Sequence, residues 1–160
     1  MGCDIHCIVE YKHRDFHGDR WDSFGYGAMN PGRDYDWFAK LAGVRGNCDN
    51  PLATGFGLPK DCSHATLYAT SVQVTDENRA KAESWVLQGL SKWQDFCVDL
   101  DNKPRYVSHP DWHTHGWCNV KDWKKSIRGT KSLQLKCVNA IIDTLTKNNC
   151  EVRVVFWFDN

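Results

Sequence analysis

The sequence has no excess of charge of either sign, no long apolar run and no Cys-x-x-Cys pair. Lysine plus arginine number 20 and aspartate plus glutamate also number 20 in 160 residues, so the whole chain has no electrostatic bias towards nucleic acid. No apolar run approaches the roughly 20 residues that cross a bilayer, and we therefore expect no membrane-spanning helix. The N-terminus has no basic region followed by an apolar stretch, which predicts that there is no secretory signal peptide.

The eight cysteines do not follow the Cys-x-x-Cys spacing that marks a structural zinc site. Five of them lie inside or beside apolar segments and are predicted to be small buried thiols: Cys3, Cys7, Cys97, Cys137 and Cys150. Without a signal peptide, free thiols indicate a reducing compartment. We therefore expect a cytoplasmic protein.

Length and composition predict one α+β domain that spans residues 1–160, since 41% of the residues are hydrophobic. Residues 3–12 alternate between apolar and polar side chains, which predicts a strand. Residues 150–159 are apolar on both faces near their end, which is typical of a central strand. We expect these two terminal strands to pair within a small central sheet. Two main helices and long loops that form the site complete the predicted fold.

Helix signals occur in four places. Residues 36–42 follow Asp34, a suitable N-cap, and precede Gly43, a suitable C-terminal stop. A longer helix is predicted from about residue 75 to residue 96, and the last helix from about residue 130 to residue 147. We expect a short helical turn at residues 122–127 and a strand at residues 68–74. We expect irregular structure at residues 97–118.

Histidines are concentrated in one short stretch. Three of the seven histidines lie between residues 109 and 115, and His113 and His115 have i, i+2 spacing. Asp4 and His6 have the same spacing and project from the polar face of the first predicted strand. One such pair alone is more simply interpreted as a solvent-facing polar edge. Imidazole and carboxylate together bind transition metals, so we predict a divalent metal ion, zinc or manganese, held by His6, His113, His115 and Asp4.

The same residues suggest a reaction. A metal-bound water is acidified and becomes a nucleophile, with Asp4 or Asp111 as a further ligand or as the base that orients it. Arg33 and Arg45 bracket the predicted helix 36–42 and are candidates to bind a phosphate group, although surface ion pairs explain them equally well. The predicted function is a metal-dependent hydrolase, a phosphoesterase acting on a nucleotide or nucleic acid. Tryptophans such as Trp112 and Trp117 would stack on a base.

Three alternatives remain open. In the first, the protein is a non-enzymatic binding module that sequesters a nucleotide signal or a host protein, with a structural metal or none. A structural zinc would be fully ligated by His109, His113, His115 and Cys118. In the second, the histidines are ordinary hydrogen-bonding residues in a polar loop. A nucleophilic cysteine is a weaker third alternative, since neither Cys118 nor Cys62 has an evident orienting partner.

Several segments together resemble a family of phage and bacterial proteins. The family opens with Met-Gly-Cys-Asp-Ile-His and ends with Trp-Phe-Asp-Asn, as in residues 1–6 and 157–160 of this chain. Further family segments match here as follows: Arg33, Tyr35, Phe38 and Ala39; Gly57, Leu58, Pro59, Asp61 and Ser63; Asp111, His113, His115 and Trp117. The resemblance covers most of the chain and implies no particular activity. It implies a phage setting, with a role in host takeover or defence evasion inside the host cytoplasm.

Overall fold

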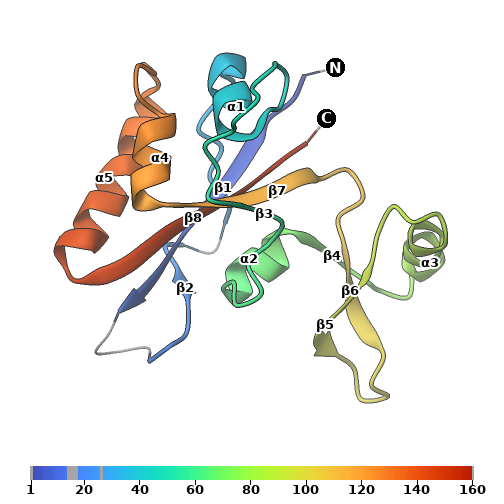
Figure 1. The fold of residues 1–160 in the computed structure, drawn as a ribbon. Coiled ribbons are helices and arrows are strands. Elements are labelled where there is room, and N and C mark those ends of the chain that lie inside the picture. Colours follow the sequence, from blue (N-terminus) through green and yellow to red (C-terminus); the bar gives the residue numbers. More distant parts are fainter. Residues whose placement is uncertain (1, 14–17, 26, 160) are drawn as a thin grey trace.

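The two terminal strands form the centre of a five-stranded antiparallel sheet with the order β2-β1-β8-β7-β3. The computed structural model describes residues 2–13, 18–25 and 27–159; Met1 and Asn160, which belong to the two terminal segments compared above with a phage family, lie outside them. Strand β1 (Ile5–His13) pairs with β8 (Cys150–Phe158) over nine residues, from Ile5 opposite Phe158 to His13 opposite Cys150. This pairing confirms the prediction for the two ends of the chain. In Figure 1 the two termini lie side by side.

Three further strands extend the large sheet. Strand β7 (His113–Asn119) pairs with the other edge of β8, and the short strands β2 (Asp22–Ser23) and β3 (Gly55–Phe56) close the two sides. Every residue of β8 except Glu151 is buried, because the strand has neighbours on both edges and packed layers on both faces. The prediction of a central strand from its apolar sequence is therefore confirmed.

Three helices cover one face of the large sheet: α1 (Tyr35–Ala42), α4 (Val120–Ser126) and α5 (Leu133–Lys147). Asp34 accepts a hydrogen bond from the backbone N–H of Trp37, and Gly43 ends α1 with a left-handed φ of 70°, as the sequence predicts. The main core lies between these helices and the inward side chains of β1 and β8, which include Cys7, Val9, Phe156 and Phe158. In the described part of the chain, no helix is both long and apolar enough to cross a membrane.

A smaller sheet lies beyond the other face of the large one (Figure 1). It has the order β4-β6-β5, formed by β4 (Ser71–Gln73), β6 (Pro104–Ser108) and β5 (Trp93–Val98). Helix α2 (His64–Ala69) precedes it, and α3 (Arg79–Leu87) packs on it through a small cluster of Val74, Ala82 and Val107. The fold is thus α+β as predicted, with five helices among the described residues instead of two main ones.

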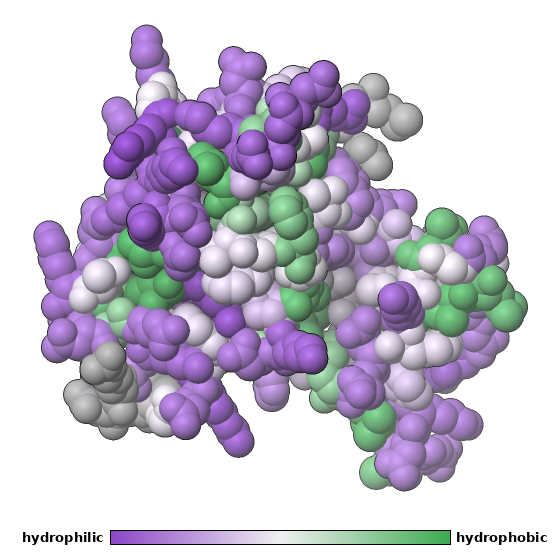
Figure 2. Space-filling view, viewed as in Figure 1, coloured by the Kyte–Doolittle hydropathy of each residue, from purple (hydrophilic) through white to green (hydrophobic). Residues whose placement is uncertain are grey.

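The sequence misplaces several elements in this region. The predicted helix 75–96 is wrong beyond Leu87, because Gly89 takes a left-handed φ of 72° and the chain returns as β5. Residues 97–118 are not irregular but contain β6 and most of β7. The predicted strand 68–74 is confirmed only for Ser71–Gln73, which form β4, because residues 68 and 69 belong to helix α2 and residue 70 is a turn. Helix α3 buries only Ala82, and Leu87 and Leu90 are exposed at its end. In Figure 2, hydrophobic residues gather on the surface where Figure 1 places α3.

All eight cysteines are free. Cys3, Cys7, Cys118 and Cys150 are buried, whereas Cys137 is exposed on α5 and Cys97 is half-buried. The predicted burial is therefore wrong for Cys137. Burial raises the pKa of the Cys7 and Cys118 thiols to about 12, which keeps both protonated and unreactive at neutral pH.

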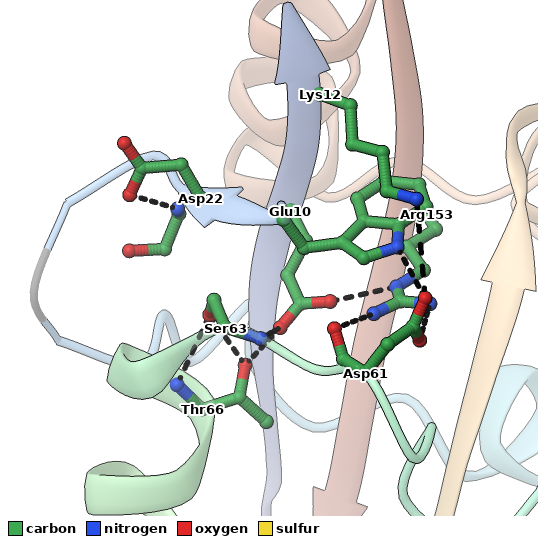
Figure 3. Close-up of polar contacts among 9 residues, drawn as sticks. Glu10, Lys12, Asp22, Asp61, Ser63, Thr66 and Arg153 are labelled. Atoms are coloured by element: carbon green, nitrogen blue, oxygen red, sulfur yellow. Dashed lines mark hydrogen bonds and ion pairs between the residues drawn. The ribbon is translucent and has the colours of Figure 1, made fainter. Parts of the chain in front are cut away.

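A buried ion pair attaches the loop before α2 to the large sheet (Figure 3). Glu10 of β1 is 0% exposed, and its Oε2 accepts a hydrogen bond of 2.7 Å from Arg153 Nε of β8. Its Oε1 accepts from the backbone N–H of Ser63 and from the Thr66 hydroxyl, both at 2.6 Å. Arg153 also donates to the Asp61 carboxylate at 2.8 Å. Both carboxylate oxygens of Glu10 are therefore hydrogen-bonded. No pattern in the sequence indicates this network.

From the buried ion pair we predict how substitutions of Arg153 and Glu10 change the free energy of unfolding. Arg153→Met leaves the Glu10 carboxylate buried without its cation and should lower the free energy of unfolding by about 3–5 kcal/mol. The double variant Glu10→Leu/Arg153→Met removes the uncompensated charge and should recover part of that loss. Urea unfolding measures both changes. The control Lys124→Met breaks the half-exposed pair with Asp143 and should cost no more than about 1 kcal/mol; equal losses for Arg153→Met and Lys124→Met would contradict the prediction.

Candidate functional site

A histidine–carboxylate pair lies at the end of the large sheet where the two chain termini meet. His6 points from β1 to the face opposite the three helices, and its Nε2 lies 2.9 Å from Asp159 Oδ2. The backbone N–H of Asp4 donates to the other carboxylate oxygen, Oδ1, at 2.8 Å. The β1–β8 register produces this contact, because it brings the residue that follows β8 beside the residue that precedes β1. The His6 side chain is 22% exposed, so the pair is sheltered but reachable.

Two arginines reach the start of β1. Arg33 donates to both carboxylate oxygens of Asp4, from Nε at 2.5 Å and from Nη2 at 2.8 Å. These hydrogen bonds lower the pKa of Asp4, which keeps it ionised at neutral pH. Burial raises the pKa of the Cys3 thiol overall, although Arg45 lies close enough to Cys3 to lower it by a smaller amount. The predicted phosphate-binding arginines thus lie beside consecutive residues of the chain.

Aromatic rings enclose His6. Trp157 of β8 and Trp112 of the β6–β7 connection lie with their ring centroids 5.8 Å and 5.7 Å from His6. Trp112 in turn stacks on His109 at 4.2 Å with an interplanar angle of 12°. Trp157 is fully buried, whereas Trp112 and His109 are partly exposed. The sequence suggested Trp112 as a stacking residue but did not identify Trp157, whose position depends on the strand register.

A β-bulge separates the two histidines of the central motif. His113 pairs with Phe158 and Gly116 pairs with Phe156. Between these two pairs β7 advances by three residues, whereas β8 advances by two. Thr114 takes up the extra residue with a left-handed φ of 48°. As a result, the His113 ring stacks on Phe158 on the helix-covered face, at 6.2 Å, and the His115 ring lies against Trp157 on the other face, at 6.5 Å. The i, i+2 spacing therefore does not place both rings on one side.

The predicted metal ligands are not assembled in this arrangement. Among the residues that the structure describes, no group of three or more His, Cys, Asp or Glu side chains is placed to hold a metal ion. Asp4, His6 and His115 share one face, and His113 lies on the other. Asp111 is exposed next to His109. Cys118, a candidate ligand of a closed zinc site, is buried in the core on the helix-covered face. Metal binding stays a prediction.

The site predicts a dependence of stability on pH. Burial is the main cause of the lowered pKa of both His115 and His109. The unfolded chain, with an ordinary histidine pKa of about 6.5, therefore takes up protons before the folded chain does. The free energy of unfolding should fall as the pH falls below about 6.5. His115→Gln removes one of these groups and should flatten that slope.

Urea titrations between pH 7.5 and 5.5 measure this effect. His64→Gln is the matched control, because His64 is exposed on α2. Equal slopes for His115→Gln, His64→Gln and the unchanged protein would contradict a neutral, buried His115.

Comparison of the chain with protein-family models, curated proteins and solved structures found no match.

Proposed function

We propose that the protein is a hydrolase of phosphate esters that acts on a nucleotide or a nucleic acid. The observation that carries this proposal is the His6–Asp159 pair, fixed by the Asp4 backbone and adjacent to the Asp4–Arg33 ion pair. A histidine oriented by a carboxylate has two chemical roles in hydrolysis. It takes a proton from the attacking water through its free nitrogen, or it holds a metal ion that acidifies the water.

The surroundings of this pair suit a phosphate group. Arg33 uses two of its five N–H groups on Asp4, and the guanidinium group has further donors for a phosphate oxygen. Its side chain is 55% exposed, so an incoming anion can reach it. Arg45 brings a second cation to the same end of β1. Both would stabilise the negative charge that develops during ester cleavage.

The aromatic stack suits a base. Trp112 and His109 present two parallel, partly exposed rings beside His6, and every nucleobase has a face that stacks on such a surface. A divalent metal ion, zinc or manganese, is included in the proposal as the cofactor. Its support is that Asp4, His6, His115 and Asp159 lie on one face of the sheet. The phage setting, the host cytoplasm and a role against host defence belong to the proposal through the family resemblance.

The experiment is a hydrolysis screen with variants chosen from the pair. Purified protein is incubated with aryl phosphate mono- and diesters, nucleotides, cyclic nucleotides and single-stranded oligonucleotides, with and without zinc or manganese. For any substrate cleaved, His6→Gln and Asp159→Asn should lower kcat/KM by about 100-fold or more, because water is no longer activated. Arg33→Gln should lower it through weaker phosphate binding.

Asp143→Asn is the matched control, since Asp143 pairs with Lys124 on the helix layer and should leave turnover unchanged. Hydrolysis that survives His6→Gln, or no hydrolysis by the unchanged protein in any condition, would contradict the proposal.

A second candidate function is a binding module that sequesters a nucleotide signal or a host protein without turnover. One arrangement favours it: the His6 ring lies beside two tryptophans, Trp112 and Trp157, in a ring cluster that needs no ion to form.

Nucleotide titrations followed by tryptophan fluorescence test this second candidate. Trp112→Ala should weaken binding of a purine nucleotide about tenfold, because one stacking surface is lost. The control Trp93→Ala removes a tryptophan from the edge of the small sheet, where it is 36% exposed, and should leave the affinity unchanged. Tight binding without hydrolysis would support the module, whereas equal affinity in both variants would contradict this stacking role.

A further inference from the structure

Two unfavourable features meet at one peptide unit of β7. Thr114 is a β-branched residue with a left-handed φ of 48°, a conformation that such residues rarely adopt. Its neighbour His113 has a buried Nε2 with no hydrogen-bond partner among the described residues, although its Nδ1 contacts the Thr114 hydroxyl at 2.9 Å. Strained backbone and unpaired buried polar atoms are rare in folded proteins, and they gather where a segment has a second function.

Removal of the bulge would relieve both features. Continued without interruption from Gly116 opposite Phe156, the pairing places His115 opposite Trp157, Thr114 opposite Phe158 and His113 opposite Asp159. Thr114 then becomes extended. His113 moves to the face that carries His6, His115 and Asp159, because a one-residue shift exchanges the two faces of a strand.

We propose that β7 has a second register in which His6, His113 and Asp159 bind a divalent transition-metal ion. Asp159 lies between its partners in this register, since β8 is flanked by β1 and β7. His6 Nε2 and Asp159 Oδ2 are 2.9 Å apart. Two ligand atoms that each lie about 2.1 Å from one tetrahedral ion are about 3.4 Å apart, so a separation of about half an ångström more would bring this pair to ligand spacing.

The ligand set indicates the class of ion and its use. Two imidazoles and one carboxylate leave a coordination position for water, which is the arrangement of catalytic zinc and related ions. This role in water activation rests on the proposed hydrolase function, whereas the metal site itself does not. In the register of the present structure His113 is turned away, so binding of the ion and closure of the bulge are coupled. The ion selects the second register.

Metal titrations of two Thr114 variants test the coupling. Glycine favours the left-handed conformation and valine disfavours it. Both replacements remove the hydroxyl group, so a comparison of the two isolates the backbone effect. Cobalt(II), whose visible absorption reports its ligands, is titrated into each protein, with zinc in competition. Thr114→Val should bind the ion about tenfold more tightly than Thr114→Gly. His113→Gln should bind the ion at least about tenfold more weakly than the unchanged chain does.

Asn149→Gly is the matched control, because Asn149 also has a left-handed φ, of 60°, in the turn before β8; it should leave the affinity unchanged. NMR of the unchanged protein gives a second measurement that does not depend on any variant folding. Addition of zinc should replace the backbone contact between His113 and Phe158 with one between His113 and Asp159. Equal affinities for the glycine and valine variants, no bound ion, or an unchanged His113–Phe158 contact would overturn the second register.

These outcomes separate the metal site from the hydrolase. Hydrolysis that depends on His6, together with no bound ion in the metal titrations, would overturn the second register and leave the hydrolase. Metal binding with the expected order of affinities, but without hydrolysis of any substrate, would overturn the hydrolase and leave the metal site.

Discussion

The nine-residue pairing of β1 with β8 is the constraint on which both the core and the site depend. Its register sends Cys7, Val9, Phe156 and Phe158 towards the helices, and it sends Glu10, Arg153, His6 and Trp157 to the opposite face. A slip of one residue would exchange these two sets, and it would bury histidine and arginine under the helices. The apolar set therefore fixes the position of the polar set. The site is assembled by the same burial that holds the sheet together.

The polar face carries two clusters of charged side chains, one buried and the other partly exposed. The Glu10–Arg153 pair lies under the loop before α2, and the Ser63 backbone, the Thr66 hydroxyl and Asp61 complete its hydrogen bonds. Such a pair fixes a loop, and its side chains are only 8% and 0% exposed, so a ligand has little access to them. The second group, at the termini, combines His6, Asp159, Asp4 and Arg33, and it is partly exposed. Chemistry with a substrate is therefore possible at the second group and not at the first.

The sequence predicted the elements whose signals are local. The alternation of residues 3–12, the apolar residues 150–159, and the caps Asp34 and Gly43 each depend on neighbouring residues only, and the structure has all of them. The predicted helix 75–96 is wrong beyond Leu87 because Trp85 and Trp93 share a helical spacing although one is in α3 and the other is in β5. The contact between His6 and Asp159 could be inferred once the terminal strands were paired. The Glu10–Arg153–Asp61 network could not, because it joins three distant segments.

The bulge at Thr114 shows most clearly why a spacing rule can fail at a site. The i, i+2 rule for His113 and His115 assumes an uninterrupted strand, and no glycine or asparagine marks the interruption. A bulge with a purely structural role would be cheaper with one of those residues at the left-handed position. Threonine there adds strain of the order of 1–3 kcal/mol, and the unpaired His113 nitrogen adds a similar cost. Together these costs reduce the difference in free energy between the bulged and the uninterrupted register. A small difference of this kind is what a single metal ion can reverse, since ligand binding shifts a two-state equilibrium only by its differential affinity.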